Sequence, residues 1–503
     1  MYVAFLLHIH QPYYKDAHTG FYRMPWVRLH GVKDYFDVVA RLERFPRFCC
    51  TVNVVPSLLE QLEECQQADV KDRFLELAQK RAAALDASER AFLLEHFFSL
   101  NWEHMVKPHP RYGQLLEMRH SAARGDGTWD LGRFSIGDYR DLQVWFFLAW
   151  SGEALRREPA VAELFAKGRN FSEADKQELF EAQRTFLSRI TPLYQRLHAQ
   201  RRIEISCSPF CHPILPLLCD TPSARVAHPD LTLPGIHFHH PEDSQHQIVE
   251  ALRYMEERLG MRPKGMWPSE GALSPEVTGQ MAEASLQWTA SDEVVLQQSL
   301  ADGRTDTHFV PYRFGKGRQA ITIFFRDREL SDLIGFTYSR WPARDAAADL
   351  MTRLTKLASV LPEEAIVSLI LDGENAWEYY PDNGRVFWET LLELIETRAE
   401  IQPVTFADYL ARHPAQAELD RLHSGSWIHG DLRTWIGHSE KNRAWELLAQ
   451  TRATAAARTT PATNRSVWQH IHAAEGSDWF WWYGDDHVSA YRAEFDLLPA
   501  LQG

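Results

Sequence analysis

Cysteine is scarce in this sequence, which has six cysteines among 503 residues, and no two of them form a Cys-x-x-Cys pair. So few thiols in so long a chain do not build a disulfide framework. Without paired cysteines, a zinc ribbon or a thioredoxin-like redox site is excluded as well. We therefore expect reduced thiols in a cytoplasmic protein.

Long hydrophobic runs and an excess of basic residues are also missing. The N-terminal apolar run, Val3–Leu7, is far shorter than the roughly 18–20 residues that cross a bilayer. Neither a basic segment before it nor a cleavage pattern after it indicates a signal peptide. Lys and Arg total 54 against 68 Asp and Glu, which gives a net charge of −14. Such a surface does not attract polyphosphates, so we expect neither a nucleic-acid partner nor a membrane partner.

Aromatic residues, by contrast, are plentiful, and 17 of them are tryptophans. Trp, Tyr and His side chains present a flat face with a polar edge, which suits stacking on sugars as well as core packing. The length of the chain fits two to four domains of roughly 100–200 residues each, or one large barrel with additions.

Short apolar runs, several of them stopped by proline, predict buried strands. Where these runs alternate with amphipathic helices, the pattern favours a parallel α/β sheet, open or closed. Residues 57–200 show helical spacing instead, and the chain after about residue 385 is again mostly helical. The sequence thus predicts an α/β domain over residues 1–385, with a helical insertion at about 57–200, and a helical C-terminal domain over 386–503. The predicted strands are Tyr2–Leu7, Phe48–Val55, Arg202–Cys207, Lys264–Pro268, Leu286–Ala290, Ala320–Phe325 and Ala365–Leu371.

Residues suited to chemistry cluster at the ends of these predicted strands. In parallel α/β barrels the active site lies at the carboxyl ends of the strands, so side chains from separate strands meet there. This convergence is a stronger signal than any single motif. The residues concerned are His8, His10, His212, Trp267, Glu270, Asp292, Arg326, Asp372 and Glu374.

Two interpretations of this cluster compete. Nitrogen and oxygen ligands from His8, His10, Asp292 and Asp372 would suit a metal ion. Alternatively, a pair of carboxylates would act on a glycosidic bond, with histidines and tryptophans holding the sugar. The spacing His8-x-His10 places both rings on one side of a strand and fits either case. The histidine-rich stretch over 237–246 receives no role.

Five segments make the sequence resemble glycoside hydrolase family 57, and they occur in the family's order. The first four are His10–Pro12, Glu204–Leu218, Gly265–Glu270 and Leu371–Glu378, and the loosest match is Ser426–Trp445. The amino-acid sequences of these segments are most similar to those of the amylopullulanase-like and α-amylase-like branch of the family.

The resemblance implies an incomplete (β/α)7 barrel followed by a C-terminal α-helical bundle that closes one side of the cleft. It also implies that Glu270 is the nucleophile and Asp372 the general acid/base of a retaining glycosidase. Crowding by Glu374 would raise the pKa of Asp372, as an acid working at neutral pH requires. The positions that the resemblance assigns to sugar binding are His8, His10, His212, Trp267, Asp292, Glu374, Trp427 and Trp435.

The expected function is hydrolysis of α-1,4 glucosidic bonds in α-glucans or maltooligosaccharides, with α-1,6 bonds as a second class, without a metal or other cofactor. The first alternative is a 4-α-glucanotransferase or branching-type transglycosylase of the same family. A more distant alternative is a metal-dependent carbohydrate deacetylase or α-mannosidase-like enzyme on a related barrel. The sequence predicts no oligomeric state.

Overall fold

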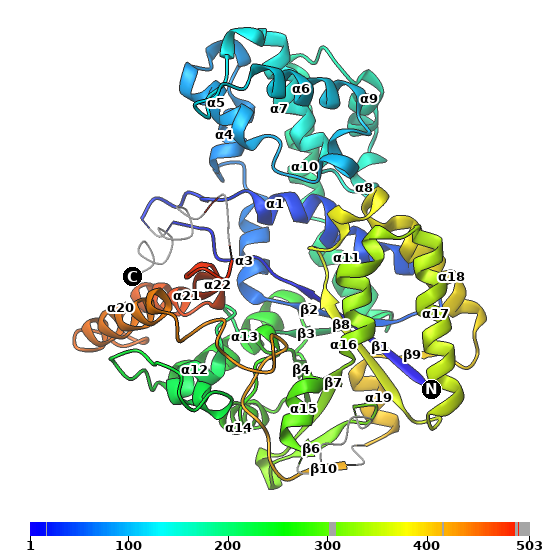
Figure 1. The fold of residues 1–503 in the computed structure, drawn as a ribbon, viewed down its shortest axis with the longest axis vertical. Coiled ribbons are helices and arrows are strands. Elements are labelled where there is room, and N and C mark those ends of the chain that lie inside the picture. Colours follow the sequence, from blue (N-terminus) through cyan, green and yellow to red (C-terminus); the bar gives the residue numbers. More distant parts are fainter. Residues whose placement is uncertain (17, 301–307, 415–416, 488–490, 492–503) are drawn as a thin grey trace.

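Seven parallel strands form a closed barrel in the computed structural model, which describes residues 1–16, 18–300, 308–414, 417–487 and 491 (Figure 1). The strand order is β8-β1-β2-β3-β4-β5-β7, and pairing of β7 with β8 closes the ring. The predicted fold class, a (β/α)7 barrel with a helical insertion and a helical C-terminal region, is therefore confirmed. The barrel strands are β1 (Tyr2–Ile9), β2 (Cys50–Val54), β3 (Ile203–Cys207), β4 (Gly265–Met266), β5 (Trp288–Asp292), β7 (Ile321–Arg326) and β8 (Ile366–Asp372).

The barrel strands are buried on both faces, which explains why their sequences are continuous apolar runs rather than alternating ones. Seven of the eight residues of β1 are buried. Side chains fill the barrel, as in other small barrels, so its interior is a core and not a channel. This inner core consists of Ala4, Leu6, Trp267, Trp288, Ala290, Phe324, Ile366, Ile370, Val404, Phe406 and Tyr409.

Helices connect the strands and cover the outside of the barrel. Several of them begin with proline in their first turn, where its missing N–H removes no hydrogen bond. The helices outside the insertion and before residue 420 are α1 (Trp26–His30), α2 (Asp37–Ala40), α12 (Leu215–Cys219), α13 (Pro241–Leu259), α14 (Pro275–Glu283), α15 (Glu293–Ser299), α16 (Arg328–Asp332), α17 (Ala343–Val360), α18 (Arg385–Thr397) and α19 (Phe406–Arg412).

The chain between β2 and β3 is a helical insertion, and most of its helices gather beyond one side of the barrel (Figure 1). Its central helix, α7 (Ile136–Ala149), is buried over ten of its residues and is packed by its neighbours on all sides. The other helices are α3 (Pro56–Glu64), α4 (Arg73–Gln79), α5 (Ala87–His96), α6 (Pro110–Ala122), α8 (Glu153–Arg156), α9 (Pro159–Lys167), α10 (Glu173–Leu187) and α11 (Ile190–Ala199).

Among the described residues, three short strands extend the sheet beyond the barrel, and none of them was predicted. Strand β6 (Tyr312–Phe314) pairs antiparallel with β7, β9 (Gln402–Pro403) pairs with β1, and β10 (Ala417–Leu419) pairs with β6. They are two or three residues long, too short for an apolar run to mark them. Strands β9 and β10 join residues 402–403 and 417–419 to the barrel sheet, and both lie within the range 386–503 that the sequence analysis assigns to the C-terminal domain.

The described part of the chain after residue 420 returns along the carboxyl ends of the barrel strands and ends in three helices. These are α20 (Ser439–Ala456), α21 (Arg465–Ala474) and α22 (Ser477–Trp482), which lie beside α12 and α13 (Figure 1). Across the described residues, we find no helix that combines the length and the apolar character that membrane spanning requires.

Candidate active site

Glu270 stands on a strained turn directly after β4. Its backbone is left-handed, with φ 57° and ψ 21°, a conformation that costs a residue with a side chain about 1–2 kcal/mol. Gly271 follows with φ 62°, and a Cβ at that position would lie 2.6 Å from the Trp267 ring. The turn directs the Glu270 carboxylate toward Trp427, whose indole Nε1–H donates to Oε2 at 2.8 Å. Strained turns of this kind concentrate at functional positions.

Trp427 reaches Glu270 because two segments far apart in the sequence pair through their backbones. Leu273 and Gly425 form an antiparallel bridge, and the Trp427 N–H donates to the carbonyl of Glu270 at 3.0 Å. Position 425 requires glycine, since a Cβ there would lie 2.2 Å from the carbonyl oxygen of Gly430. The segment after β10 is thus held against the carboxyl end of the barrel at the Glu270 turn.

Asp372 is the last residue of β8, and the strand register places it beside His8 of β1. The N–H of Gly373 donates to the carbonyl of His8 at 2.6 Å. A Cβ at position 373 would lie 2.7 Å from Cγ2 of Ile9, so only glycine permits this close approach. The side-chain amide of Asn375 donates to Asp372 Oδ2 at 3.2 Å. The Asp-Gly-Glu-Asn motif therefore sets the position of the Asp372 carboxyl against β1.

The two carboxyl groups, Glu270 and Asp372, interact electrostatically. Burial raises the pKa of Glu270 to about 8; the hydrogen bond from Trp427 opposes this shift, and the negative charges of Asp372 and Asp478 add to it. Burial also raises the pKa of Asp372, against the hydrogen bond from Asn375. The pair accordingly retains a proton at a pH where isolated carboxyl groups have lost theirs.

Three imidazole rings lie together next to Asp372, and two of them, His8 and His212, are buried. The His10 ring lies 3.9 Å from the His212 ring and 5.9 Å from the His8 ring, measured between centroids. Burial lowers the pKa of His8 to about 3 and that of His212 well below its usual value, so both rings are neutral. Neutral His8 donates from Nδ1 to Oδ1 of Asn53 at 2.7 Å. The predicted histidines are thus brought together.

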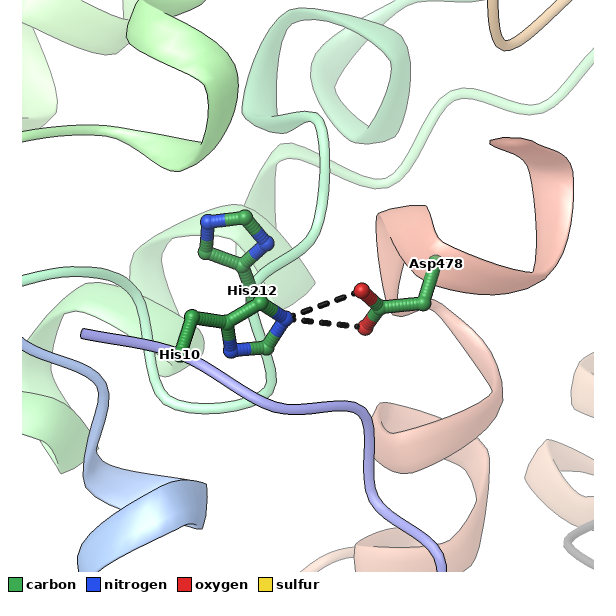
Figure 2. Close-up of side chains that lie close together, drawn as sticks. All are labelled: His10, His212 and Asp478. Atoms are coloured by element: carbon green, nitrogen blue, oxygen red, sulfur yellow. Dashed lines mark hydrogen bonds and ion pairs between the residues drawn. The ribbon is translucent and has the colours of Figure 1, made fainter. Parts of the chain in front are cut away.

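Asp478 completes this cluster, and the sequence analysis did not identify it (Figure 2). Its two carboxylate oxygens lie 2.9 and 3.1 Å from His10 Nε2. The segment is anchored by a bridge between Pro213 and Gly476 and by the Ser477 hydroxyl, 3.0 Å from Nδ1 of His212. In the sequence Asp478 precedes a run of aromatic residues, a pattern typical of helix packing. The polar pair Ser477-Asp478 before that run was the only sequence feature that could have indicated a site residue here.

The metal interpretation is weaker in this geometry. His10, His212 and Asp478 do place ligand atoms within 4.8 Å of one another. However, imidazole lone pairs lie in the ring planes, and the two rings are stacked with 27° between their planes, so the lone pairs run side by side instead of converging. Of the ligands considered from the sequence, Asp292 is bound by two arginines, Arg326 at 3.3 Å and Arg328 at 3.1 Å.

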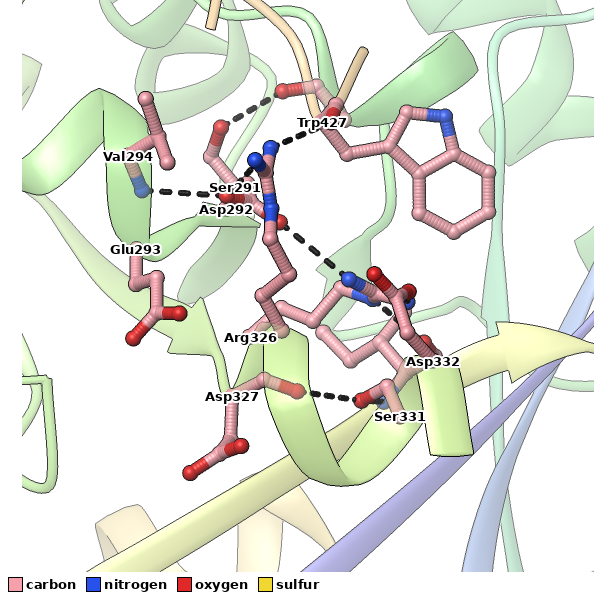
Figure 3. A network of polar contacts seen from close by, with 12 residues as sticks. Ser291, Asp292, Glu293, Val294, Arg326, Asp327, Ser331, Asp332 and Trp427 are labelled. Atoms are coloured by element: carbon pink, nitrogen blue, oxygen red, sulfur yellow. Dashed lines mark hydrogen bonds and ion pairs between the residues drawn. The ribbon is translucent and has the colours of Figure 1, made fainter. Parts of the chain in front are cut away.

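Arg326, the last residue of β7, lies between Asp292 and Trp427 (Figure 3). Its guanidinium pairs with Asp292 and lies 5.2 Å from the centroid of the Trp427 ring. Nε of Arg326 donates to the carbonyl of Ile370 at 2.7 Å. Asp292 is fully buried, and its ion pair with Arg326 holds the guanidinium beside the Trp427 ring.

Solvent exposure divides the predicted site residues into two groups. Glu270, Asp372, His10 and Trp427 are partly exposed, as is Asp478, so a substrate can reach them. The others are buried: Glu374 accepts a hydrogen bond from the His10 backbone, and Trp267 packs in the barrel core. The buried residues are His8, His212, Trp267, Asp292, Glu374 and Trp435.

Trp435 lies apart from this group. It is fully buried in the C-terminal region, where its carbonyl accepts a hydrogen bond from Trp445 and its ring lies 6.1 Å from that of Trp481. We therefore leave Trp435 out of the candidate site. Glu204, the first residue of the family-like segment Glu204–Leu218, also lies away from the site. Its carboxylate accepts hydrogen bonds from the Trp288 indole and from the Ala407 backbone inside the barrel.

Comparison with solved structures shows the same fold over the whole length of the chain. A branching enzyme of GH57 type from Pyrococcus horikoshii has a TM-score of 0.61 at 16% identity. The match covers 100% of this chain and 87% of the branching-enzyme chain. The α-amylase AmyC from Thermotoga maritima has a TM-score of 0.58 at 13% identity, covering 99% and 91%.

Sequence comparison finds two curated relatives that match only part of the chain. Alpha-amylase 1 of Dictyoglomus thermophilum is 22% identical over 263 residues, which is 51% of this chain and 33% of that enzyme. The 4-alpha-glucanotransferase of Thermococcus litoralis is 23% identical over 172 residues, 34% of this chain and 25% of the transferase. The chain thus spans about a third of the length of the alpha-amylase and about a quarter of the length of the glucanotransferase.

The family model described as glycosyl hydrolase family 57 matches residues 4–420, which include all of the barrel except the first two residues of β1, the insertion and both candidate catalytic carboxyl groups. This confirms the resemblance seen in the sequence: the chain belongs to glycosyl hydrolase family 57.

Proposed function

We propose that this chain is a retaining enzyme that cleaves α-1,4 bonds of α-glucans through a covalent glycosyl-enzyme. Glu270 is the proposed nucleophile and Asp372 the proposed general acid/base. The observation that carries the proposal is a pair of partly exposed, electrostatically coupled carboxyl groups at the ends of β4 and β8. The names of the relatives, alpha-amylase, branching enzyme and 4-alpha-glucanotransferase, support an α-glucan as the substrate.

In the first step Glu270 attacks the anomeric carbon while Asp372 protonates the departing glycosidic oxygen. The Trp427 indole N–H already holds Oε2 of Glu270 and favours its ionised form, which leaves Oε1 for the attack. The first step requires the single proton of the pair on Asp372. The strained Glu270 turn keeps the carboxylate in this position before substrate arrives.

In the second step Asp372, now ionised, takes a proton from water, which displaces the sugar from Glu270. Two successive inversions return the α-anomer. During both steps the partly exposed His10 and Asp478 stay hydrogen-bonded to each other, and the buried Nδ1 of His10 has no hydrogen-bond partner among the described residues.

The anomer released first tests the retaining mechanism, and proton NMR of fresh maltooligosaccharide digests measures it. We expect the α-anomer. Glu270→Ala should abolish turnover, and azide should restore cleavage of an activated α-glucoside with the β-glucosyl azide as product. The matched control is Glu276→Ala, at an exposed position of α14, which should keep full activity. An initial β-anomer from the unaltered enzyme would refute the nucleophile assignment.

Transfer to a second sugar competes with water in the second step, and the same family contains transferases by name. Products longer than the starting maltooligosaccharide would identify a transferase. Glucose and short products alone would identify a hydrolase, and pullulan would report cleavage of α-1,6 bonds.

A further inference from the structure

Two histidines and an aspartate converge on the surface next to the end of α12, outside the candidate active site. Nε2 of His237 lies 2.5 Å from Oδ1 of Asp220, and Nδ1 of His239 lies 3.7 Å from the same oxygen. One ligand atom from each of the three residues falls within 4.8 Å of the others. Both histidine side chains are more than half exposed, at 59% and 57%.

The backbone builds this arrangement. Residues 218–221 and 238–240 lie alongside each other, with the Thr221 N–H donating to the carbonyl of Phe238 at 3.1 Å and the His240 N–H to that of Leu218 at 2.8 Å. Phe238 is fully buried, and its ring lies 5.2 Å from the ring of Trp445. Because neighbouring side chains on an extended segment point to opposite sides, burial of Phe238 turns the residues before and after it outward, toward Asp220.

We propose that Asp220, His237 and His239 form a surface site for a divalent transition-metal ion of the zinc type. Imidazole nitrogens with one carboxylate oxygen are ligands that suit zinc, whereas calcium and magnesium prefer oxygen ligands alone. Three protein ligands leave the remaining position to solvent. Nothing in this site depends on the proposed glycosidase reaction.

The ion would close the loop between Asp220 and His237, and this loop is part of the junction with the C-terminal helices. The N–H of Gly235 donates to Glu446 of α20 at 2.9 Å, and the side-chain amide of Asn442 donates to the carbonyl of Thr232 at 2.9 Å. An ion that binds only the folded chain raises the stability of the fold. The expected consequence is a higher Tm of the barrel and C-terminal region in the presence of zinc.

Calorimetric titration of the full chain with zinc chloride tests the site. We expect one saturable site on the unaltered chain, weakened at least ~10-fold in H239Q and in D220N, because each variant removes one direct ligand. The matched control is H120Q, at an exposed histidine on α6 that lies outside the cluster, and it should bind zinc like the unaltered chain. Zinc should raise the Tm of the unaltered chain and of H120Q but not of H239Q.

A second variant separates this site from the candidate active-site histidines. D478N alters the cluster with His10 and His212 and should leave the titrated site intact. Zinc affinity that is unchanged in H239Q and D220N, or that is lost in D478N, would overturn the proposal.

Discussion

At the scale of single residues, the candidate site depends on how the protein distributes protons among closely placed carboxyl groups. Desolvation raises the pKa values of Glu270, Asp372 and Glu374 alike. What separates their roles is the hydrogen bonding around each: an indole donor for Glu270, a side-chain amide for Asp372 and a backbone N–H for Glu374. A neighbouring donor favours the charged form of a carboxyl group, so the indole N–H supports the ionised Glu270 that the proposed attack requires.

Asp372→Asn should slow cleavage of natural glucans by the ~10²–10⁴-fold that general acid–base catalysis contributes. An activated phenolic leaving group needs little protonation, so such substrates should lose much less in the first step. Steady-state kinetics on both substrate types measures the difference, with Asp382→Asn at an exposed position as the control. Equal losses on the two substrates would mean that Asp372 is structural.

Trp427→Phe should shift the pH dependence. The indole N–H stabilises the ionised form of Glu270, so its removal raises the pKa of Glu270 further above the value of about 8. Hydrogen bonds to charged groups contribute about 1.5–3 kcal/mol, which corresponds to about one to two pH units. Activity requires ionised Glu270, so the ascending limb of kcat/KM against pH should move to higher pH by that amount. If the ascending limb of the pH profile does not move, the Trp427 N–H does not stabilise the ionised form of Glu270.

At the scale of elements, the sequence predicted the barrel well because parallel strands buried on both faces carry continuous apolar runs. Strand β8, predicted over Ala365–Leu371, is observed over Ile366–Asp372. The same reasoning places Glu270 after β4 and Asp372 at the end of β8, as the structure has them.

What the sequence could not predict depends on pairing between distant segments. Trp427 reaches Glu270 through the Leu273–Gly425 bridge, and Asp478 reaches His10 through the Pro213–Gly476 bridge. Neither segment has an apolar periodicity that marks its destination, and Trp435, eight positions after Trp427, is buried elsewhere. Aromatic residues alone therefore do not distinguish a sugar-facing position from a packed one.

Gly373→Ala tests how closely β8 must approach β1. Its Cβ would lie 2.7 Å from Ile9 and 3.2 Å from the carbonyl oxygen of His8, so the Asp372 end of the strand must shift. A displacement near 1 Å at a catalytic group costs about 10²-fold in rate, and we expect kcat to fall by that order. Gly279→Ala is the control, because its Cβ would meet no atom within 4 Å on α14. Full activity in Gly373→Ala would show that the close approach is dispensable.

At the scale of the whole molecule, the C-terminal helices are part of the candidate site and not an appendage. Glu475, three residues before Asp478, accepts a hydrogen bond from Gln247 of the barrel helix α13 at 2.9 Å. On the same helix, Asp243 is bound by Arg452 of α20 at 2.8 Å. Docking of α20 and α21 onto α13 therefore places the aspartate that contacts His10.

This docking interface should make stability depend on pH. Burial raises the pKa of Glu475 well above its usual value, and the charge of Asp243 adds to the shift. Between the ordinary glutamate pKa and this raised value, the folded chain holds a proton that the unfolded chain has lost. The free energy of unfolding must then decrease as pH rises through that window, by at most about 1.4 kcal/mol per pH unit from this group.

Glu475→Gln removes the ionisation while keeping an oxygen for the Gln247 amide, so it should remove this part of the slope. Urea unfolding at a series of pH values measures it, with the exposed Glu276→Gln as the matched control. The variant should gain stability relative to the unaltered chain as pH rises, because only the unaltered chain must bury a charge or hold a proton at Glu475. Parallel stability curves for the two chains would place the pH dependence elsewhere and leave Glu475 a purely hydrogen-bonding residue.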